Sequence, residues 1–404
     1  MRNFTFKGLF LTAVFILLGC LSIQATNDDL ITKQITIKLD EAGTLPDRIG
    51  SSRKYKITNL KLVGEINGTD FRMSREMAGR DYRGDVTEGN LSVLDLSEAK
   101  IVSGGEAYYG YFDMYKGENK FYYTYKDEIG DYAFYACRKL TSLTLPSNLT
   151  KIGENAFKDC SGLTSLNLPA GITEIGWFAF EGCSGLTSLN LPAGITRISS
   201  YAFYGCSGLT SLNLPAGITR IGQYAFYNCS GLTSLNLPDG ITSISDGTFS
   251  GCSGLTSLNL PAGITEIGWN AFEGCSGLTT LTLPAGITSI GREAFSGCSG
   301  LTSIYVYAEK VPGIGSDAFK GCDAKKCILY VPKGTYDDYW LSDFGAYFEN
   351  IVEFDATGID KTTTSTDVEE VSRYSVNGQR LVGPTKGLNI VKYSDGSVKK
   401  VAVE

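Results

Sequence analysis

Histidine is absent from all 404 residues, and this restricts the chemistry that the chain can perform. Neither a Ser-His-Asp triad nor a Cys-His pair can form, and the commonest metal ligand is missing. Pairs of carboxylates could still hydrolyse a glycosidic bond, and four acids stand near aromatic residues: Asp113, Glu118, Asp127 and Glu128. Carboxylates beside aromatics are thin grounds for a glycosidase. We therefore predict a protein that is not an enzyme and that uses no cofactor.

Eight cysteines recur at a constant interval of 23 residues: Cys137, Cys160, Cys183, Cys206, Cys229, Cys252, Cys275 and Cys298. Equivalent residues on stacked turns lie about 4.8 Å apart with parallel side chains, whereas a disulfide needs Cβ atoms about 3.8 Å apart. We predict a column of buried free thiols. Cys322 continues the column after one extra residue and Cys327 is off register, so a disulfide between these two stays open. Without histidine or a second cysteine pair, we expect no metal site.

The N-terminus predicts a secretory signal over residues 1–25, because Arg2 and Lys7 precede a short apolar run. Two processing sites compete. Leu17-Leu18-Gly19-Cys20 fits a lipobox, in which an acylated Cys20 would anchor the protein to a membrane. Ser22-Ile23-Gln24-Ala25 fits an ordinary cleavage site that leaves a free protein. We expect a cell-surface or secreted protein, with a bacterial outer-membrane lipoprotein as the anchored form and no other membrane contact. The net charge of −7 argues against nucleic acid as a partner.

One segment, LTSLNLPAGITEIGWFAFEGCSG at 163–185, recurs with small changes at 186, 209, 232 and 255. Its period lies in the leucine-rich-repeat range. In each turn Pro169 or its equivalent ends a short strand, because proline cannot donate to a ladder. The residues expected in the core are Leu163, Leu166, Leu168, Ile172 and Ile175, followed by Ala179, Phe180 and Cys183 from a short helical turn. Stacked turns bury what one turn cannot, which predicts an α/β repeat solenoid with parallel strands.

The rest of the chain is assigned around this repeat. We predict an N-terminal cap at 26–56, degenerate repeats with a tyrosine-rich insertion at 57–128, and regular repeats at 129–321. A C-terminal cap at 322–355 and a polar linker at 356–370 follow. Asn377-Gly378 and Asp395-Gly396 are hairpin signals in a small β module at 371–404.

Three surfaces are candidates for binding. The outward serine and asparagine columns, which begin at Ser165 and Asn167, form either a hydrogen-bonded ladder or a flat face for a repetitive ligand. Aromatic residues at variable positions form a contact surface or cover the edge of the core: Trp177, Phe178, Tyr201, Tyr204, Tyr224, Tyr227 and Trp269. The insertion at 105–128 is a binding loop or a hairpin on the solenoid flank, and its candidate residues are Tyr108, Tyr109, Tyr111 and Tyr115.

The pattern AFxxCxxLxxLxLPxxIxxIGxxAF resembles the BspA-like leucine-rich repeat proteins of bacterial surfaces. INGTDFRMSREMAG and LYVPKGTYDDYW are also similar to members of that family from Bacteroides-type bacteria, and the C-terminal module resembles terminal modules that include sorting signals. The resemblance implies adherence to host matrix proteins and other bacteria, and it implies no catalytic residues. We expect a monomeric adhesin for an extracellular protein or glycan. The alternative is an envelope lipoprotein that scaffolds a fixed protein partner.

Overall fold

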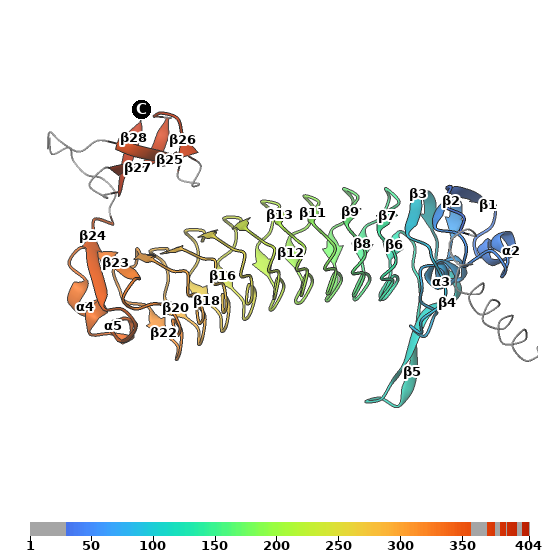
Figure 1. Cartoon of the computed structure of the whole chain (residues 1–404), viewed down its shortest axis with the longest axis horizontal. Helices are drawn as coiled ribbons and strands as arrows, with labels where there is room; N and C mark the ends of the chain where they lie inside the picture. Colours follow the sequence, from blue (N-terminus) through green and yellow to red (C-terminus); the bar gives the residue numbers. More distant parts are fainter. Residues whose placement is uncertain (1–29, 357–369, 376–379, 385, 394–397, 404) are drawn as a thin grey trace, which may run out of the picture.

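A computed structural model describes residues 30–356, 370–375, 380–384, 386–393 and 398–403. The chain is a parallel β-solenoid, which runs across Figure 1 from its N-terminal cap to α4 and α5. The predicted fold class is confirmed. The predicted signal peptide with Cys20 and most of the predicted linker lie outside the described residues.

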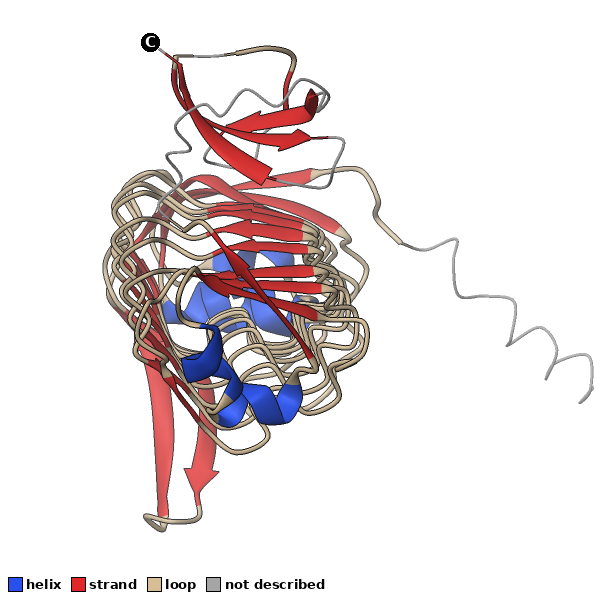
Figure 2. Cartoon of the chain, turned by 90° about the vertical axis from the view of Figure 1, so that its left-hand side faces the viewer, coloured by secondary structure: helices blue, strands red, loops and turns tan. Residues whose placement is uncertain are grey.

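The first ladder contains the longer strands, which pair in parallel from turn to turn within two sheets. They are β1 (Ile35–Leu39), β2 (Asn59–Ile66), β3 (Val93–Ile101), β7 (Ser142–Thr144), β9 (Ser165–Asn167), β11 (Ser188–Asn190), β13 (Ser211–Asn213), β15 (Ser234–Asn236), β17 (Ser257–Asn259), β19 (Thr280–Leu283), β21 (Ser303–Val306), β23 (Ile328–Pro332) and β24 (Asn350–Phe354). Figure 2 shows these strands superposed along one side of the solenoid. The ladder begins earlier than the predicted residue 57, because β1 already pairs in register with β2.

A second ladder of two-residue strands follows on the next side of each turn. Its members are β6 (Glu128–Ile129), β8 (Lys151–Ile152), β10 (Glu174–Ile175), β12 (Arg197–Ile198), β14 (Arg220–Ile221), β16 (Ser243–Ile244), β18 (Glu266–Ile267), β20 (Ser289–Ile290) and β22 (Gly313–Ile314). This ladder is interrupted between β10 and β12 and again between β14 and β16.

Each interruption precedes a turn in which serine replaces a glycine of the repeat. The Gly176 N–H donates to the Ile152 carbonyl in the preceding turn at 2.9 Å. A Cβ at Gly176 would lie 2.6 Å from backbone atoms of that turn. In the serine turns the hydroxyl bonds instead, since Ser199 Oγ donates to Ile175 at 2.6 Å and Ser245 Oγ to Ile221 at 2.7 Å. The added Cβ therefore separates the strands, and the side chain replaces the lost backbone bond.

The third side of each turn differs from the predicted short helical turn. Phe178 and its equivalents Tyr201 and Tyr224 have left-handed φ values of 54–60°, which a continuous right-handed helix excludes. Backbone bonds run between turns as well, for example from Phe180 N–H to the Ala202 carbonyl at 2.8 Å. The segment is thus a third, turn-based ladder, and the described α-helices lie in the caps: α2 (Leu45–Ile49), α3 (Gly68–Met77), α4 (Tyr336–Trp340) and α5 (Asp343–Tyr347).

The core is a set of residue columns. Nine phenylalanines from Phe134 to Phe319 stack with ring centroids 5.2–5.5 Å apart. The cysteine column is buried and free of disulfides, as predicted. From Cys160 to Cys298 each thiol donates to a phenylalanine carbonyl at 2.9–3.2 Å. Cys322 and Cys327 are free thiols too, which answers the open question of a small-loop disulfide.

At the N-terminal end, the buried Arg75 of α3 bonds carbonyls of the first regular turn, of which Tyr132 also accepts from the Tyr135 N–H at 3.1 Å. Its guanidinium donates to Tyr132 at 2.8 Å and to Ala133 at 3.1 Å. Arg80 donates to Ala136 at 3.1 Å. At the C-terminal end the Tyr339 hydroxyl donates to the Ala308 carbonyl at 2.6 Å. Both ends of the solenoid are therefore closed by side chains that satisfy backbone groups.

Two further elements depart from the solenoid. The insertion is a hairpin of β4 (Gly104–Asp113) and β5 (Glu118–Thr124), which points away from the solenoid in Figure 1. The C-terminal module is a four-stranded antiparallel sheet of β25 (Glu370–Ser375), β26 (Arg380–Leu381), β27 (Gly387–Tyr393) and β28 (Val398–Val403). Its two predicted hairpin turns lie outside the described residues.

Candidate functional site

We define the aromatic patch as the variable aromatic residues Trp177, Phe178, Tyr201, Tyr204, Tyr224, Tyr227 and Trp269, five of which form two ring stacks. Phe178 stacks on Tyr201 at 4.6 Å and Tyr201 on Tyr224 at 5.1 Å. A parallel pair, Tyr204 and Tyr227, stacks at 4.7 Å. All five of these side chains are half-buried. They cover the edge of the core and also present part of their surface to solvent.

The two tryptophans of the patch stand clear of the core. Trp177 is 57% exposed and Trp269 is 63% exposed. They occupy the same position of turns four repeats apart, and neighbouring turns are spaced by the 5.2–5.5 Å of the phenylalanine column. Between them lie the smaller or polar Ser200, Gln223 and Asp246. Exposed tryptophan of this kind is typical of contact surfaces.

The four predicted tyrosines of the hairpin differ in burial, and the first two are buried. Tyr108 is 1% exposed and its hydroxyl donates to the Asp131 carbonyl at 2.7 Å. Tyr109 is 6% exposed, stacks on Tyr132 at 4.8 Å and lies under the Arg75 guanidinium at 5.1 Å. Burial raises the pKa of Tyr109 to about 12 and that of Tyr108 further. These two residues belong to the core, so including them among ligand contacts was wrong.

The other two predicted residues lie further along the hairpin. Tyr111 is half-buried against Tyr122, and Tyr115 at the tip is fully exposed. Five exposed side chains beside them were not among the predicted site residues: Phe112, Met114, Phe121, Tyr123 and Tyr125. Strand alternation could have revealed part of this face, because Phe112 lies on the opposite side of β4 from Tyr109 and Tyr111, which both pack against Tyr132.

Asp113, one of the four acids considered for hydrolysis, is held by donors within the hairpin. Asp113 lies 3.3 Å from Lys120. Burial works against ionisation of Asp113, but hydrogen bonds from the Lys116 and Tyr115 N–H groups and from Lys120 outweigh it and lower the pKa. A general acid needs a raised pKa. Repeat solenoids of this kind are typically binding scaffolds. Within the described residues, no group of three or more acids or cysteines could hold a metal ion.

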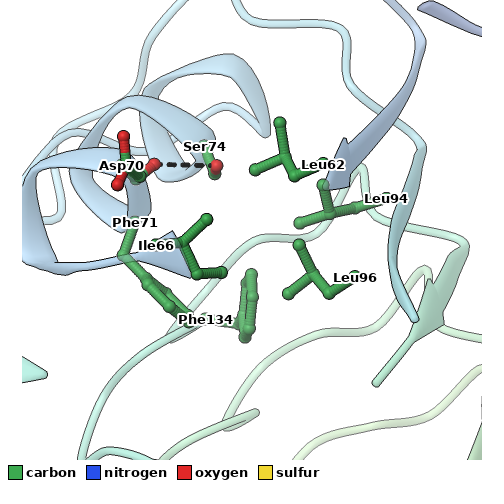
Figure 3. Close-up of a pocket in the computed structure, with 8 residues that line it drawn as sticks. All are labelled: Leu62, Ile66, Asp70, Phe71, Ser74, Leu94, Leu96 and Phe134. Carbon is green, nitrogen blue, oxygen red and sulfur yellow. Dashed lines mark hydrogen bonds between the residues drawn. The ribbon is translucent and has the colours of Figure 1, made fainter. Parts of the chain in front are cut away.

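A small pocket under α3 is shown in Figure 3. It is lined by Leu62, Ile66, Asp70, Phe71, Ser74, Leu94, Leu96 and Phe134. The space left between these side chains does not admit a water molecule. The Asp70 carboxylate accepts from the N–H groups of Gly43, Leu45 and Asn67, at 2.6–3.0 Å. The pocket is therefore a packed part of the N-terminal cap.

The outward columns of the first ladder are exposed from Ser165 and Asn167 onward. In the described part of the chain, the one hydroxyl bond along these columns joins Thr280 to Ser303 at 3.1 Å. The hydrogen-bonded ladder lies one residue earlier, where each threonine from Thr164 to Thr302 donates to the preceding threonine's carbonyl at 3.1–3.4 Å. The serine and asparagine side chains thus remain available to solvent.

Six copies of the BspA type leucine rich repeat region match residues 127–236 and 219–336, which together make up more than half of the chain. The chain belongs to this family. Among proteins of curated function, none matches the sequence. Of the described helices, none has the length and apolarity that crossing a membrane requires.

Solved structures similar to this BspA-type chain include three bacterial proteins. A T. pallidum leucine-rich repeat protein is 37% identical over 37% of this chain and 71% of its own, with a TM-score of 0.36. A leucine-rich repeat protein from Bacteroides ovatus is 24% identical over 57% and 82%, with a TM-score of 0.30. A leucine rich cell surface protein from Faecalibacterium prausnitzii is 23% identical over 57% and 84%, with a TM-score of 0.26.

Proposed function

We propose that this BspA-type protein is a secreted or cell-surface adhesin for a host matrix protein or glycan. The observation that carries the proposal is the aromatic patch, in which Trp177 and Trp269 expose more than half of their surface on a scaffold whose core positions are nearly invariant from turn to turn. Rigid aromatic anchors of this kind dominate binding energy at interfaces. The resemblance to bacterial surface proteins supports the location, and a lipid anchor at Cys20 remains part of the proposal.

The test is binding of the purified mature chain to immobilised fibronectin, collagen and mucin glycans. We expect saturable binding that a Trp177→Ser/Trp269→Ser double variant loses. Trp340→Ser is the matched control, because Trp340 is also exposed but lies on α4 in the C-terminal cap. Absence of saturable binding across the panel, or equal loss in both variants, would overturn the proposal.

A second function is supported by the hairpin, whose exposed Phe112, Met114 and Tyr115 suit a fixed protein partner. The protein would then be an envelope lipoprotein that scaffolds a complex. A pull-down from native membranes would recover a stoichiometric partner that a Phe112→Ser/Tyr115→Ser variant fails to hold and that the Trp177→Ser/Trp269→Ser variant retains. Recovery of no stoichiometric partner would reject this function.

A further inference from the structure

Two arginines lie side by side on the second ladder without a structural partner. Arg197 on β12 and Arg220 on β14 pair residue to residue, and both side chains are exposed. Adjacent strands are about 4.8 Å apart, a spacing at which like charges repel. Within the described residues, neither guanidinium has a carboxylate at ion-pair distance or a hydrogen-bond acceptor. By contrast, Arg292 on a later turn bonds Glu293 at 2.8 Å.

The same two turns carry the stacked tyrosines. Tyr201 and Tyr204 follow Arg197 in one turn, and Tyr224 and Tyr227 follow Arg220 in the next. Trp177 stands on the turn before. In the arginine turns, the position of Trp177 is occupied by Ser200 and Gln223, each three residues after its arginine. Three residues span at most about 11 Å of chain. A ligand of two or three sugars can therefore contact the arginines and the aromatic rings together.

The chemistry of these side chains selects an acidic sugar. A guanidinium bonds a carboxylate through two parallel N–H groups. Trp177, which is 57% exposed, offers an aromatic ring that can stack on the C–H face of a pyranose ring. The tyrosine rings stack face to face on one another, so they meet a ligand with their edges and hydroxyls. These hydroxyls, with Ser200 and Gln223, can bond sugar hydroxyls.

Carboxylates limit how much negative charge the ligand can carry. Along the row of the two arginines, Glu174 lies one turn before and Glu266 two turns after, and both are exposed. The separation between each glutamate and the nearer arginine, one or two turns, is comparable to the screening length of about 8 Å at physiological salt. A polymer with an acid on every second sugar would bring its next charge against one of these glutamates. An isolated carboxylate held between the two arginines would lie nearer to both arginines than to either glutamate.

We propose that turns 173–270 bind a glycan that carries one carboxylate among neutral sugars, as in chains ending in sialic acid. Arg197 and Arg220 hold the carboxylate, and Trp177 with the tyrosine stack holds the adjoining sugars. This inference rests on the proposed adhesin function and names the ligand class of the aromatic patch.

The test titrates the mature chain with 3′-sialyllactose, lactose, a heparin oligosaccharide and a glutamate-containing peptide, using calorimetry and tryptophan fluorescence. We expect saturable binding of 3′-sialyllactose and at least about tenfold weaker binding in Arg197→Gln and in Arg220→Gln, since each loses a charged hydrogen bond. Arg138→Gln, an exposed arginine near Asp159, is the control and should bind normally.

Equal binding of lactose, tighter binding of heparin, or binding of the peptide alone would overturn the inference. So would a full affinity for 3′-sialyllactose in both arginine variants. If 3′-sialyllactose does not bind while the matrix panel still binds in a Trp177- and Trp269-dependent way, this inference fails and the adhesin function stands. If neither binds, both fail.

Discussion

Ser199 and Ser245 test how neighbouring turns of the solenoid are held together, because their hydroxyls replace a backbone bond. In Ser199→Ala the Cβ stays and the donor is lost, so the Ile175 carbonyl is left unpaired inside the protein. An unsatisfied buried acceptor costs about 1–3 kcal/mol. In Ser199→Gly the N–H can return to the carbonyl as it does at Gly176. The entropic cost of glycine, about 0.5–1 kcal/mol, should leave this variant within about 1 kcal/mol of the parent.

The reciprocal changes at Gly176 use the same geometry in reverse. A Cβ there would lie 2.6 Å from the Gly153 carbonyl carbon and the Glu154 nitrogen, which are backbone atoms that cannot rotate away. Gly176→Ala should therefore separate the turns and lose the N–H bond without compensation. Gly176→Ser should be the milder change, because its hydroxyl can take over the bond as it does in Ser199.

The assay is denaturant unfolding combined with amide hydrogen exchange, since long repeat arrays depart from two-state behaviour and exchange reports local opening. Faster exchange should be confined to the turns around Ile175 in Ser199→Ala and around Ile152 in Gly176→Ala. The reasoning is refuted if Ser199→Ala is as stable as Ser199→Gly, or if Gly176→Ser is no more stable than Gly176→Ala.

Three further predictions concern the core, the N-terminal cap and the hairpin. Burial raises the pKa of the Cys206 thiol from its ordinary value to about 12. Its contribution to stability is therefore present below about pH 9 and is lost as the pH rises towards 12. Thiol reagents at pH 8 should label Cys206 only after unfolding. Labelling of the native chain at the free-thiol rate would contradict this. Arg75→Met leaves cap carbonyls unpaired and should lower the free energy of unfolding by at least about 2 kcal/mol. Its control, Arg72→Met, breaks a surface ion pair and should change the free energy of unfolding by less than about 1 kcal/mol. Equal denaturant midpoints for these two variants would contradict the capping role of Arg75. Tyr109→Ala should cost about 3 kcal/mol or more and Tyr115→Ala less than about 0.5 kcal/mol, and equal melting temperatures would reject the division of the hairpin.

The period of 23 was enough to predict the fold, because a regular spacing of Leu, Ile, Phe and Cys places the same residues inward on every turn. The form of the third side was mispredicted, although the sequence carried a signal for it. The repeat position of Gly182 is occupied by Asp159 and Asn228 on other turns. Gly, Asp and Asn are the residues that adopt left-handed backbone most readily, and these positions do so.

The hairpin shows what periodicity could not decide. Its tyrosines are clustered in the sequence, and the alternation of side chains along each strand places them on two faces. Which part of each face is covered depends on where the base of the hairpin packs. Tyr109 is buried because Tyr132 and Arg75 meet it from distant parts of the chain. No local pattern around Tyr109 records those contacts, so the sequence could not distinguish it from the exposed Tyr115.

The candidate site lies on turns whose residues differ from those of the other turns. A turn contacts only its neighbours, so most positions need only match the next turn, and the chain repeats them. Arg197 and Arg220, the four tyrosines, and the serine-marked interruptions of the second ladder all fall on the same two turns or at their borders. Ser199 opens the ladder, but its hydroxyl replaces the lost bond between turns. The adjacent arginines repel one another, so the stacking of turns does not account for them, whereas the proposed glycan site does.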